Sequence, residues 1–345
     1  MNQRYPVLPR RKFLAASAAL PLAFLARGGF IDAGAAGEAF SLPRCRLLPL
    51  PDHQTAFQLG DRESARWHFG PQYPRPFFFP FNGPSGISLT RMGHPGAPNH
   101  DHHRSIWFAH HDVDGISFWT ESSPARIRQK EWLCYVDGEN ECTMAVRLGW
   151  FANGHERELL EQTLIAIARP LDGGEHTLEL QSTFRAVAQP VRLGQTNFGF
   201  LAVRVAKSIS EFFGGGRLTD SEGRQTEAAI FGRQAQWMDY SGPVATGATE
   251  GLTYFDHPSN PGHPAHWHVR EDGWMGASFS MTEARVIAPD APLRLRYLLH
   301  AHRGSLDSKK AETVLNAFRL SPCWDVRPSK AKHRQHEIVR LGDGN

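Results

Sequence analysis

Apolar-rich segments of strand length make up most of this chain, and alternation of hydrophobic and polar residues with a period of two, the pattern that is typical of β-strands, is visible among them. The clearest case is the segment 175–184, where Leu178 and Leu180 share one face and Thr177, Glu179 and Gln181 share the other. Turn residues such as Gly, Pro, Asp and Asn separate the alternating segments. The pattern predicts strands at residues 126–136, 143–151, 159–168, 176–187, 198–206, 252–255 and 293–302.

Helical periodicity is scarce and concentrates at residues 309–320, where Ala311, Val314, Leu315 and Phe318 recur at helical spacing. Short strands that are separated by turn residues along nearly the whole chain predict an all-β protein, built as a large antiparallel β-sandwich with one short helix near 309–320. We expect a single domain over residues 40–323, followed by a polar C-terminal tail at 324–345.

The N-terminus has the features of an export signal. Arg10-Arg11-Lys12 precedes an apolar run at 13–26, and Ala33-Gly34-Ala35 offers the small residues that a signal peptidase accepts. These features predict a twin-arginine (Tat) signal peptide over residues 1–35 and a periplasmic or secreted protein. The run is too short to span a bilayer, so no membrane span is expected in the mature chain. An uncleaved N-terminal anchor is the alternative.

Charge argues against nucleic acid as a partner. The chain has 38 basic and 35 acidic residues, but residues 1–35 hold five of the bases and one of the acids. The remainder is almost neutral and contains no run rich in lysine and arginine, which nucleic-acid binding requires.

The four cysteines are Cys45, Cys134, Cys142 and Cys323. Cys134 and Cys142 flank the turn signal Asp137-Gly138, and a tight hairpin there would place their sulfurs opposite each other. A disulfide or two buried free thiols are both compatible with this spacing. No C-x-x-C is present, which excludes a thiolate zinc site.

Chemistry concentrates where the histidines cluster, because twelve of the eighteen fall in three short segments. The first segment runs from His94 to Trp119, the second from Phe255 to Arg270, and the third ends a strand with His300 and His302. H-x-H spacing in an extended chain puts both imidazoles on one face, roughly 6–7 Å apart at Cα.

Such pairs are suited to two kinds of chemistry. Neutral imidazoles can share a divalent metal, with His100, His102 and His266 as the candidate ligands. They can also act as an acid/base pair, because histidine titrates near neutral pH. No G-x-S-x-G, H-E-x-x-H or phosphate-loop context is present, so a nucleotide cofactor is not expected.

The motifs around these histidines look like those of a known family. They include Arg75-Pro76-Phe77-Phe78-Phe79-Pro80, His102-His103-Arg104-x-x-Trp107 and Trp267-His268-Val269-Arg270, and the likeness extends over roughly residues 45–320. The chain resembles the PmoA-like family of exported bacterial proteins. This resemblance implies a galactose-mutarotase-like supersandwich, a fold whose members bind sugars and in some cases move protons on them with a histidine and a carboxylate.

Three functions follow as alternatives. The first is a periplasmic carbohydrate-active enzyme, a lyase, hydrolase or epimerase that acts on a small-molecule or oligosaccharide substrate. In this function His103 and His268 transfer protons and Asp256 orients an imidazole, while indoles pack on sugar rings and guanidinium groups grip hydroxyls or a carboxylate. The substrate-binding residues are then Arg104, Trp107, His110, Asp112, His257, Trp267 and Arg270. The second function is a metal-dependent oxygenase or hydrolase, and the third is a carbohydrate-binding protein without activity.

Overall fold

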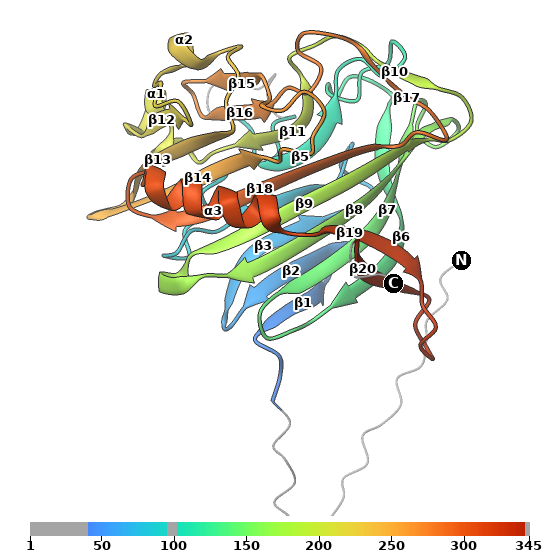
Figure 1. The fold of residues 1–345 in the computed structure, drawn as a ribbon, viewed down its shortest axis with the longest axis horizontal. Coiled ribbons are helices and arrows are strands. Elements are labelled where there is room, and N and C mark those ends of the chain that lie inside the picture. The colour runs from blue at the N-terminus through green and yellow to red at the C-terminus, as the bar shows by residue number, and fades with distance from the viewer. Residues whose placement is uncertain (1–40, 95–101, 342–345) are drawn as a thin grey trace, which may run out of the picture. The chain divides into compact units, whose positions relative to one another are not determined.

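Two eight-stranded antiparallel sheets form the fold in the computed structural model, which describes residues 41–94 and 102–341 (Figure 1). The chain from Pro43 onward forms one compact unit. The first sheet has the strand order β1 (Cys45–Leu50), β2 (Gln54–Leu59), β3 (Arg62–His68), β4 (Phe77–Phe81), β5 (Ile106–His110), β11 (Gly199–Arg204), β16 (Trp274–Ala277), β15 (Trp267–Arg270).

The second sheet is formed mainly by the middle of the chain. Its strand order is β12 (Arg217–Asp220), β13 (Trp237–Ala245), β14 (Ala248–Asp256), β18 (Leu293–Arg303), β9 (His176–Ala186), β8 (Glu158–Pro170), β7 (Cys142–Phe151), β6 (Arg126–Val136). Two small pairs join β10 (Val191–Leu193) to β17 (Arg285–Ile287) and β19 (Cys323–Pro328) to β20 (His336–Leu341). The helical elements are η2 (Asp172–Gly174), η3 (Lys207–Ile209), α1 (Glu211–Gly214), α2 (Glu227–Ile230) and α3 (Ser308–Leu320).

The inner faces of the two sheets share one hydrophobic core. Phe57 and Phe108 from the first sheet belong to the same buried cluster as Leu178, Leu180 and Tyr297 from the second. Leu178 and Leu180 point inward together because alternate strand residues share a face. The predictions of an all-β antiparallel sandwich and of a short helix near 309–320 are therefore confirmed.

The outer face of the second sheet is covered by helix α3. Asp307 caps the helix by accepting hydrogen bonds from the backbone N–H groups of Lys309 and Lys310. Three apolar residues of the helix, Ala311, Leu315 and Phe318, pack against Trp237, Phe255 and Leu298 of the sheet. Burial of this apolar face holds a thirteen-residue helix that would be marginal in isolation.

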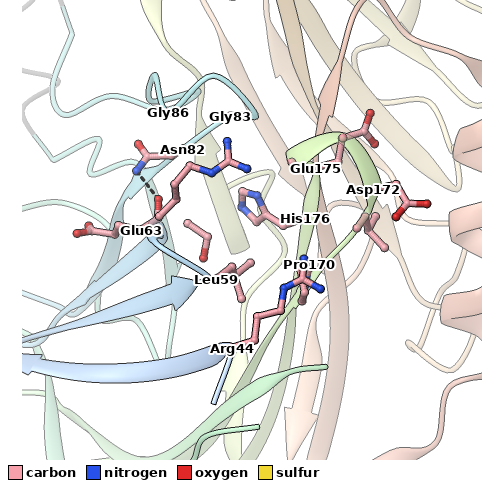
Figure 2. Close-up of a pocket in the computed structure, with 15 residues that line it drawn as sticks. Arg44, Leu59, Glu63, Asn82, Gly83, Gly86, Pro170, Asp172, Glu175 and His176 are labelled. Atoms are coloured by element: carbon pink, nitrogen blue, oxygen red, sulfur yellow. Dashed lines mark hydrogen bonds between the residues drawn. The ribbon is translucent and has the colours of Figure 1, made fainter. Parts of the chain in front are cut away.

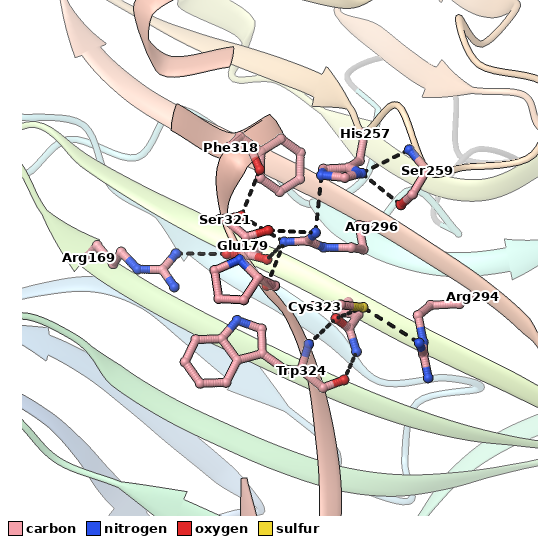
Figure 3. A network of polar contacts seen from close by, with 12 residues as sticks. Arg169, Glu179, His257, Ser259, Arg294, Arg296, Phe318, Ser321, Cys323 and Trp324 are labelled. Atoms are coloured by element: carbon pink, nitrogen blue, oxygen red, sulfur yellow. Dashed lines mark hydrogen bonds and ion pairs between the residues drawn. The ribbon is translucent and has the colours of Figure 1, made fainter. Parts of the chain in front are cut away.

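A buried polar network ties the segment after α3 to this sheet (Figure 3). Glu179 accepts from Arg296 Nη2 at 2.7 Å and from Arg169 Nη1 at 2.8 Å. Arg296 also donates to the Ser321 hydroxyl at 2.8 Å and to the Pro322 carbonyl at 3.2 Å. The polar face predicted for the strand 176–187 therefore faces α3 and β19, and at Glu179 it is fully buried.

The chain after Trp324 differs from the polar tail expected of the sequence, because most of it forms the β19–β20 hairpin. Trp324, Val326 and Ile338 pack against Leu133, Ala145, Ile165 and Ile167 on the outer face of the second sheet. Gln181 of β9 binds the hairpin to the sheet, because its side-chain amide donates to the Trp324 C=O and accepts from the Trp324 N–H. Burial of one alternating apolar face explains why this charged segment is ordered.

The four cysteines are free. The sulfurs of Cys134 and Cys142 do not face each other, because the β6–β7 register pairs Cys134 with Ala145 and Val136 with Thr143. β6 ends at Val136 and β7 begins at Cys142, so the loop that joins them is longer than a tight turn at Asp137-Gly138, and the tight hairpin assumed from the sequence is wrong. Among the described residues, no helix is long and apolar enough to cross a membrane. Residues 1–35, the predicted signal peptide, lie outside the described part of the chain.

Candidate functional site

A cavity of about 350 Å³ lies on the side of the first sheet that faces away from the sandwich core. It brings together two of the histidine segments: His102 and His103 precede β5, and His268 and Arg270 lie on β15. The other lining residues are His111, Trp119, Thr120, Phe198, Arg204, Asp272 and Trp274. Segments that are distant in the sequence therefore form one site.

Strand register explains this convergence. Trp107 of β5 pairs with Ala202 of β11, Ala202 pairs with Gly276 of β16, and Gly276 pairs with His268 of β15. Directly paired residues point to the same face of a sheet, so these four positions form a row across it. The two small residues in the middle of the row leave space for the Trp274 indole. An ideal Cβ on Gly276 would lie 3.7 Å from Cζ2 of this indole, an ordinary contact distance.

Trp274 is the centre of an aromatic cluster in the cavity wall. Its ring centroid lies 5.0 Å from that of His103, 5.3 Å from Trp107, 5.4 Å from Trp119 and 5.7 Å from His268. Among the described residues, the buried Nε1 atoms of Trp107 and Trp274 have no hydrogen-bond partner. The wall thus combines apolar ring faces with indole N–H donors, which is suited to a ligand with both C–H faces and oxygen atoms.

His268 has a defined protonation state. Its Nδ1 lies 3.1 Å from the Asn197 carbonyl oxygen, which can only accept a hydrogen bond, so Nδ1 carries the proton. Burial lowers the pKa of His268 to about 4, although the bond to Asn197 opposes this shift. The imidazole is therefore neutral at pH 7, and its Nε2 has a lone pair that can accept a proton or bind a metal.

Asp272 and Arg204 form the charged part of the cavity wall. One Asp272 oxygen accepts from Arg204 Nη1 at 2.7 Å, and the other lies 2.7 Å from His94 Nε2. Burial acts to raise the pKa of Asp272, but the hydrogen bonds from Arg204 and His94 outweigh it and hold the pKa well below its ordinary value. The carboxyl group is therefore ionised and cannot donate a proton near neutral pH.

The two basic residues of the cavity differ in exposure. Arg204 is 1% exposed, and its Nε and Nη2 have no hydrogen-bond partner in the described part of the chain. Arg270 lies at the rim with its side chain 49% exposed, where it pairs with Glu227 at 2.6 Å and stacks over Phe231. Arg270 can therefore exchange its surface partner for a ligand at low cost.

Three residues predicted from the second histidine segment do not line this cavity. Asp256 accepts from the backbone of Ala265 and pairs with His263 Nδ1 at 2.8 Å, so it does not orient His268. His257 lies against Arg296 beneath helix α3. Trp267 is fully buried in the sandwich core because it precedes His268 in the strand and faces the opposite side. The structure therefore does not place these residues at the cavity, neither Asp256, predicted to orient an imidazole, nor His257 and Trp267, predicted to bind substrate.

The residues predicted around β5 divide between the two faces of the sheet. Trp107 lies on the cavity side beneath Trp274, whereas His110 points into the sandwich and contacts the Ser280 hydroxyl at 2.8 Å. Burial lowers the pKa of His110 to about 4. Asp112 closes a turn by accepting from the Gly115 N–H, and it is not among the lining residues.

Arg104 has a structural partner of its own. Its guanidinium donates two hydrogen bonds to Glu121 and lies over the Tyr73 ring. It is not among the lining residues of the cavity.

The predicted metal ligands are not brought together in the described chain. His102 lines the cavity, His266 is half-buried outside the lining, and His100 lies outside the described residues. Within residues 41–94 and 102–341, no group of three His, Cys, Asp or Glu side chains is arranged to hold a metal ion. The third histidine segment is paired with acids: His300 with Glu175 at 3.0 Å and His302 with Asp239 at 2.8 Å.

Several residues of the cavity were not singled out by the sequence patterns. Trp274, Asp272, Arg204 and Phe198 lie on strands or turns without a histidine motif, and only the register of β11 and β16 places them here. His111, which lies between the predicted residues His110 and Asp112, also lines the cavity. The sequence offered one signal, the Asp272-Gly273-Trp274 turn, where Gly273 has a φ of +99° that favours glycine.

Comparison with known proteins identifies a family but not an activity. A model described as "Family of unknown function (DUF6807)" matches residues 54–316, most of the chain. No curated protein matches the sequence.

Solved structures with a detectable likeness are distant. One is a "Putative kojibiose phosphorylase from human microbiome", with 8% identity, a TM-score of 0.35 and coverage of 81% of this chain and 36% of that one. Another is "a putative mutarotase (YeaD) from Salmonella typhimurium", with 13% identity, a TM-score of 0.32 and coverage of 76% of this chain and 95% of that one. A third is the "Heparinase III-BT4657 gene product", with 10% identity, a TM-score of 0.32 and coverage of 88% of this chain and 43% of that one. This chain spans less than half of the first and third proteins, and at these TM-scores the likeness supports no statement about function.

Proposed function

The chain belongs to DUF6807, a family of unknown function, and we propose that it is a carbohydrate-active enzyme that transfers protons on a sugar by means of His268 and His103. The reaction class is that of a lyase or an epimerase, in which a base removes a proton from a carbon atom of the sugar. The proposal also includes membership of the PmoA-like group of exported proteins, which the sequence motifs suggest, and export to the periplasm by the twin-arginine route.

The observation that carries the proposal is the state of His268. A buried neutral imidazole, with Nδ1–H donated to a backbone carbonyl, presents an unprotonated Nε2 in a ligand-sized cavity. This is the arrangement of a general base. His103 contacts the same Trp274 indole and supplies a second titratable group for the opposite proton transfer.

The carboxylates favour a lyase or an epimerase over an ordinary hydrolase. Glycoside hydrolysis commonly uses two carboxyl groups, one of them protonated. Among the described lining residues, Asp272 is the one acid, and its two oxygens are bonded to Arg204 and His94. Proton abstraction beside a sugar carboxylate instead needs a base and a cation. His268 and the rim residue Arg270 can supply these two groups.

The aromatic wall supports a sugar as the ligand. The Trp274 and Trp119 rings and the Phe198 ring line the cavity, and aromatic faces pack well against the C–H face of a pyranose. A substrate carboxylate near Arg270 would gain a bidentate ion pair in exchange for the solvent-exposed pair with Glu227.

The test uses a matched pair of histidine variants. His268→Gln keeps an N–H donor for the Asn197 carbonyl but removes the base, whereas His266→Gln alters a half-buried histidine of the same segment outside the cavity lining. Uronate-containing oligosaccharides would be screened for unsaturated products by ultraviolet absorbance. Incorporation of deuterium from heavy water would be followed by NMR.

We expect turnover that falls by about 10²–10⁴-fold in His268→Gln and is unchanged in His266→Gln. Equal activity of both variants, with unchanged melting temperatures, would refute the role of His268. Tight glycan binding without any product or deuterium exchange would instead support a binding protein. Stoichiometric metal in untagged protein, found by elemental analysis, would support the metal-dependent alternative.

A further inference from the structure

A second cavity, of about 210 Å³, lies at one end of the sandwich and shares no lining residue with the first (Figure 2). Its walls come from both sheets: the β2–β3 turn contributes Leu59 and Arg62, and the β8–β9 turn contributes residues from Pro170 to His176. Arg44, just before β1, completes the wall on one side.

The carboxylates around this cavity are directed elsewhere or already paired. Glu63 binds Arg66 through both oxygens, at 2.9 and 2.8 Å. Glu175 pairs with Lys310 at 2.6 Å and with His300 at 3.0 Å. Figure 2 shows the carboxylates of Glu63 and Asp172 at the outer sides of the pocket, directed away from the His176 ring.

The two arginines, in contrast, have no carboxylate partner among the described residues. Arg62 donates to the Pro84 carbonyl at 2.7 Å, and within the described chain Arg44 takes part in no side-chain hydrogen bond or ion pair. Both residues are exposed, so their remaining N–H groups can reach a ligand. The cavity therefore has two guanidinium groups whose charge is not neutralised by a bound acid.

Glycine at position 174 is required for the approach of Arg62. An ideal Cβ at Gly174, whose φ is +81°, would lie 2.6 Å from Arg62 Nη2. A Cβ at this position would shift the guanidinium, which is the flexible end of its side chain, and would also strain the turn. The local backbone is thus adapted to admit a cation between the two sheets.

His176 lies at the centre of the pocket (Figure 2). It is 4% exposed, and its Nε2 is buried without a hydrogen-bond partner in the described chain. Burial lowers the pKa of His176 to about 3, and the nearby charges of His300 and Arg62 act in the same direction. A neutral imidazole has one N–H group to donate, so it can add a donor to those of the two guanidinium groups.

We propose that this cavity binds a compact oxoanion, the phosphate, sulfate or carboxylate group of a small molecule, between Arg44 and Arg62 and above His176. Guanidinium groups bind such anions through paired N–H donors, and a bound anion would give both guanidinium groups the charged acceptor that they lack in the described chain. The site is separate from the proposed proton-transfer site and does not depend on it.

The test is isothermal titration calorimetry on the full chain, with inorganic phosphate, sulfate and malonate as titrants in a chloride buffer. We expect saturable binding at one site for at least one of these anions. Arg62→Gln and Arg44→Gln should each weaken binding at least tenfold. Arg217→Gln, which changes an exposed arginine of β12 away from the cavity, should bind like the wild type.

Two outcomes would overturn the proposal: no saturable heat with any of the three anions, or unchanged affinity in Arg62→Gln. The order of affinity among the anions distinguishes a phosphate or sulfate ester from a carboxylate as the natural group. His268→Gln should bind the anion as tightly as the wild type, which separates this result from the fate of the proposed enzyme activity.

Discussion

The buried pair of Glu179 and Arg296 offers a direct test of what holds the C-terminal part of the chain to the second sheet. The side chains are 1% and 2% exposed, and Glu179 Oε1 lies 2.7 Å from Arg296 Nη2. Glu179→Gln removes the charge and leaves the shape almost unchanged. The Arg296 guanidinium then stays buried with only neutral partners, which are the His257 imidazole, the Ser321 hydroxyl and the backbone carbonyls of Ser321 and Pro322.

The expected cost follows from the burial of the pair. Breaking a buried ion pair at one partner costs about 3–5 kcal/mol, because the other charge is left uncompensated. With an unfolding entropy of about 2.1 cal/mol/K per residue over roughly 300 residues, this corresponds to a fall in Tm of about 5–8 °C. Glu158→Gln, at the partly exposed pair with Lys130, should cost only about 0–1 kcal/mol.

Urea unfolding followed by circular dichroism measures these free energies of unfolding. The double variant Glu179→Leu/Arg296→Met tests whether the cost comes from the uncompensated charge. Replacing both charges by apolar groups of similar size removes the uncompensated charge, so the double variant should be more stable than Glu179→Gln. A cost below about 1 kcal/mol for Glu179→Gln would refute the uncompensated-charge argument. So would a double variant that is the less stable of the two.

Three further predictions concern histidines and glycines. Burial acts to lower the pKa of His302, but Asp239 outweighs it and raises the pKa above the ordinary value. The pair therefore adds stability that is fully present below pH ~6.5 and is lost as the pH rises through the folded pKa; Asp239→Asn should abolish this dependence in urea unfolding at pH 6 and pH 8. For His268, NMR titration of the ring protons should give a midpoint of about 4, and a midpoint near the ordinary value would contradict the neutral base. Finally, Gly251→Ala should lower stability by about 1–3 kcal/mol, because its Cβ would lie 2.5 Å from the His302 ring. Gly276→Ala is the control and should be tolerated, because its Cβ would lie 3.7 Å from Trp274. Equal melting temperatures of the two variants would contradict this prediction.

Much of the fold could be predicted because strand-length apolar segments are separated by turn residues, and some of them, such as 175–184, alternate with a period of two. The predicted strand 126–136 and helix 309–320 agree with β6 and α3 to within one residue at each end. The order of strands in the sheets could not be predicted, because pairing depends on contacts between distant segments. This is why Trp274, which reaches the cavity only through the pairing of β16 with β11 and β15, was missed.

The errors at the site have a common physical origin. Trp107 and His110 are three residues apart in one strand, so they cannot both face the same pocket, and the structure places them on opposite faces. Asp256 is bound within its own loop by His263 and the Ala265 N–H. Proximity in sequence favoured these residues for one site. Their positions instead follow from the alternation of side chains between the two faces of a strand and from hydrogen bonds within the loop.

Histidines cluster where the strands bury polar side chains, and the surroundings of each ring determine whether it is charged or neutral. A carboxylate partner ties a ring into the scaffold, and at His302 the partner Asp239 outweighs burial and raises the pKa of the imidazole. At His300 burial outweighs the partner Glu175 and lowers the pKa. A backbone carbonyl partner, as for His268 and Asn197, fixes the tautomer while burial keeps the ring neutral. His268 differs from His300 and His302 because it lines the cavity and its Nδ1–H is donated to a backbone carbonyl, so that its Nε2 lone pair is not engaged by a carboxylate. The histidine-rich composition therefore pointed toward the cavity, and the burial and location of each ring separate the proposed base from the histidines held in the sheet.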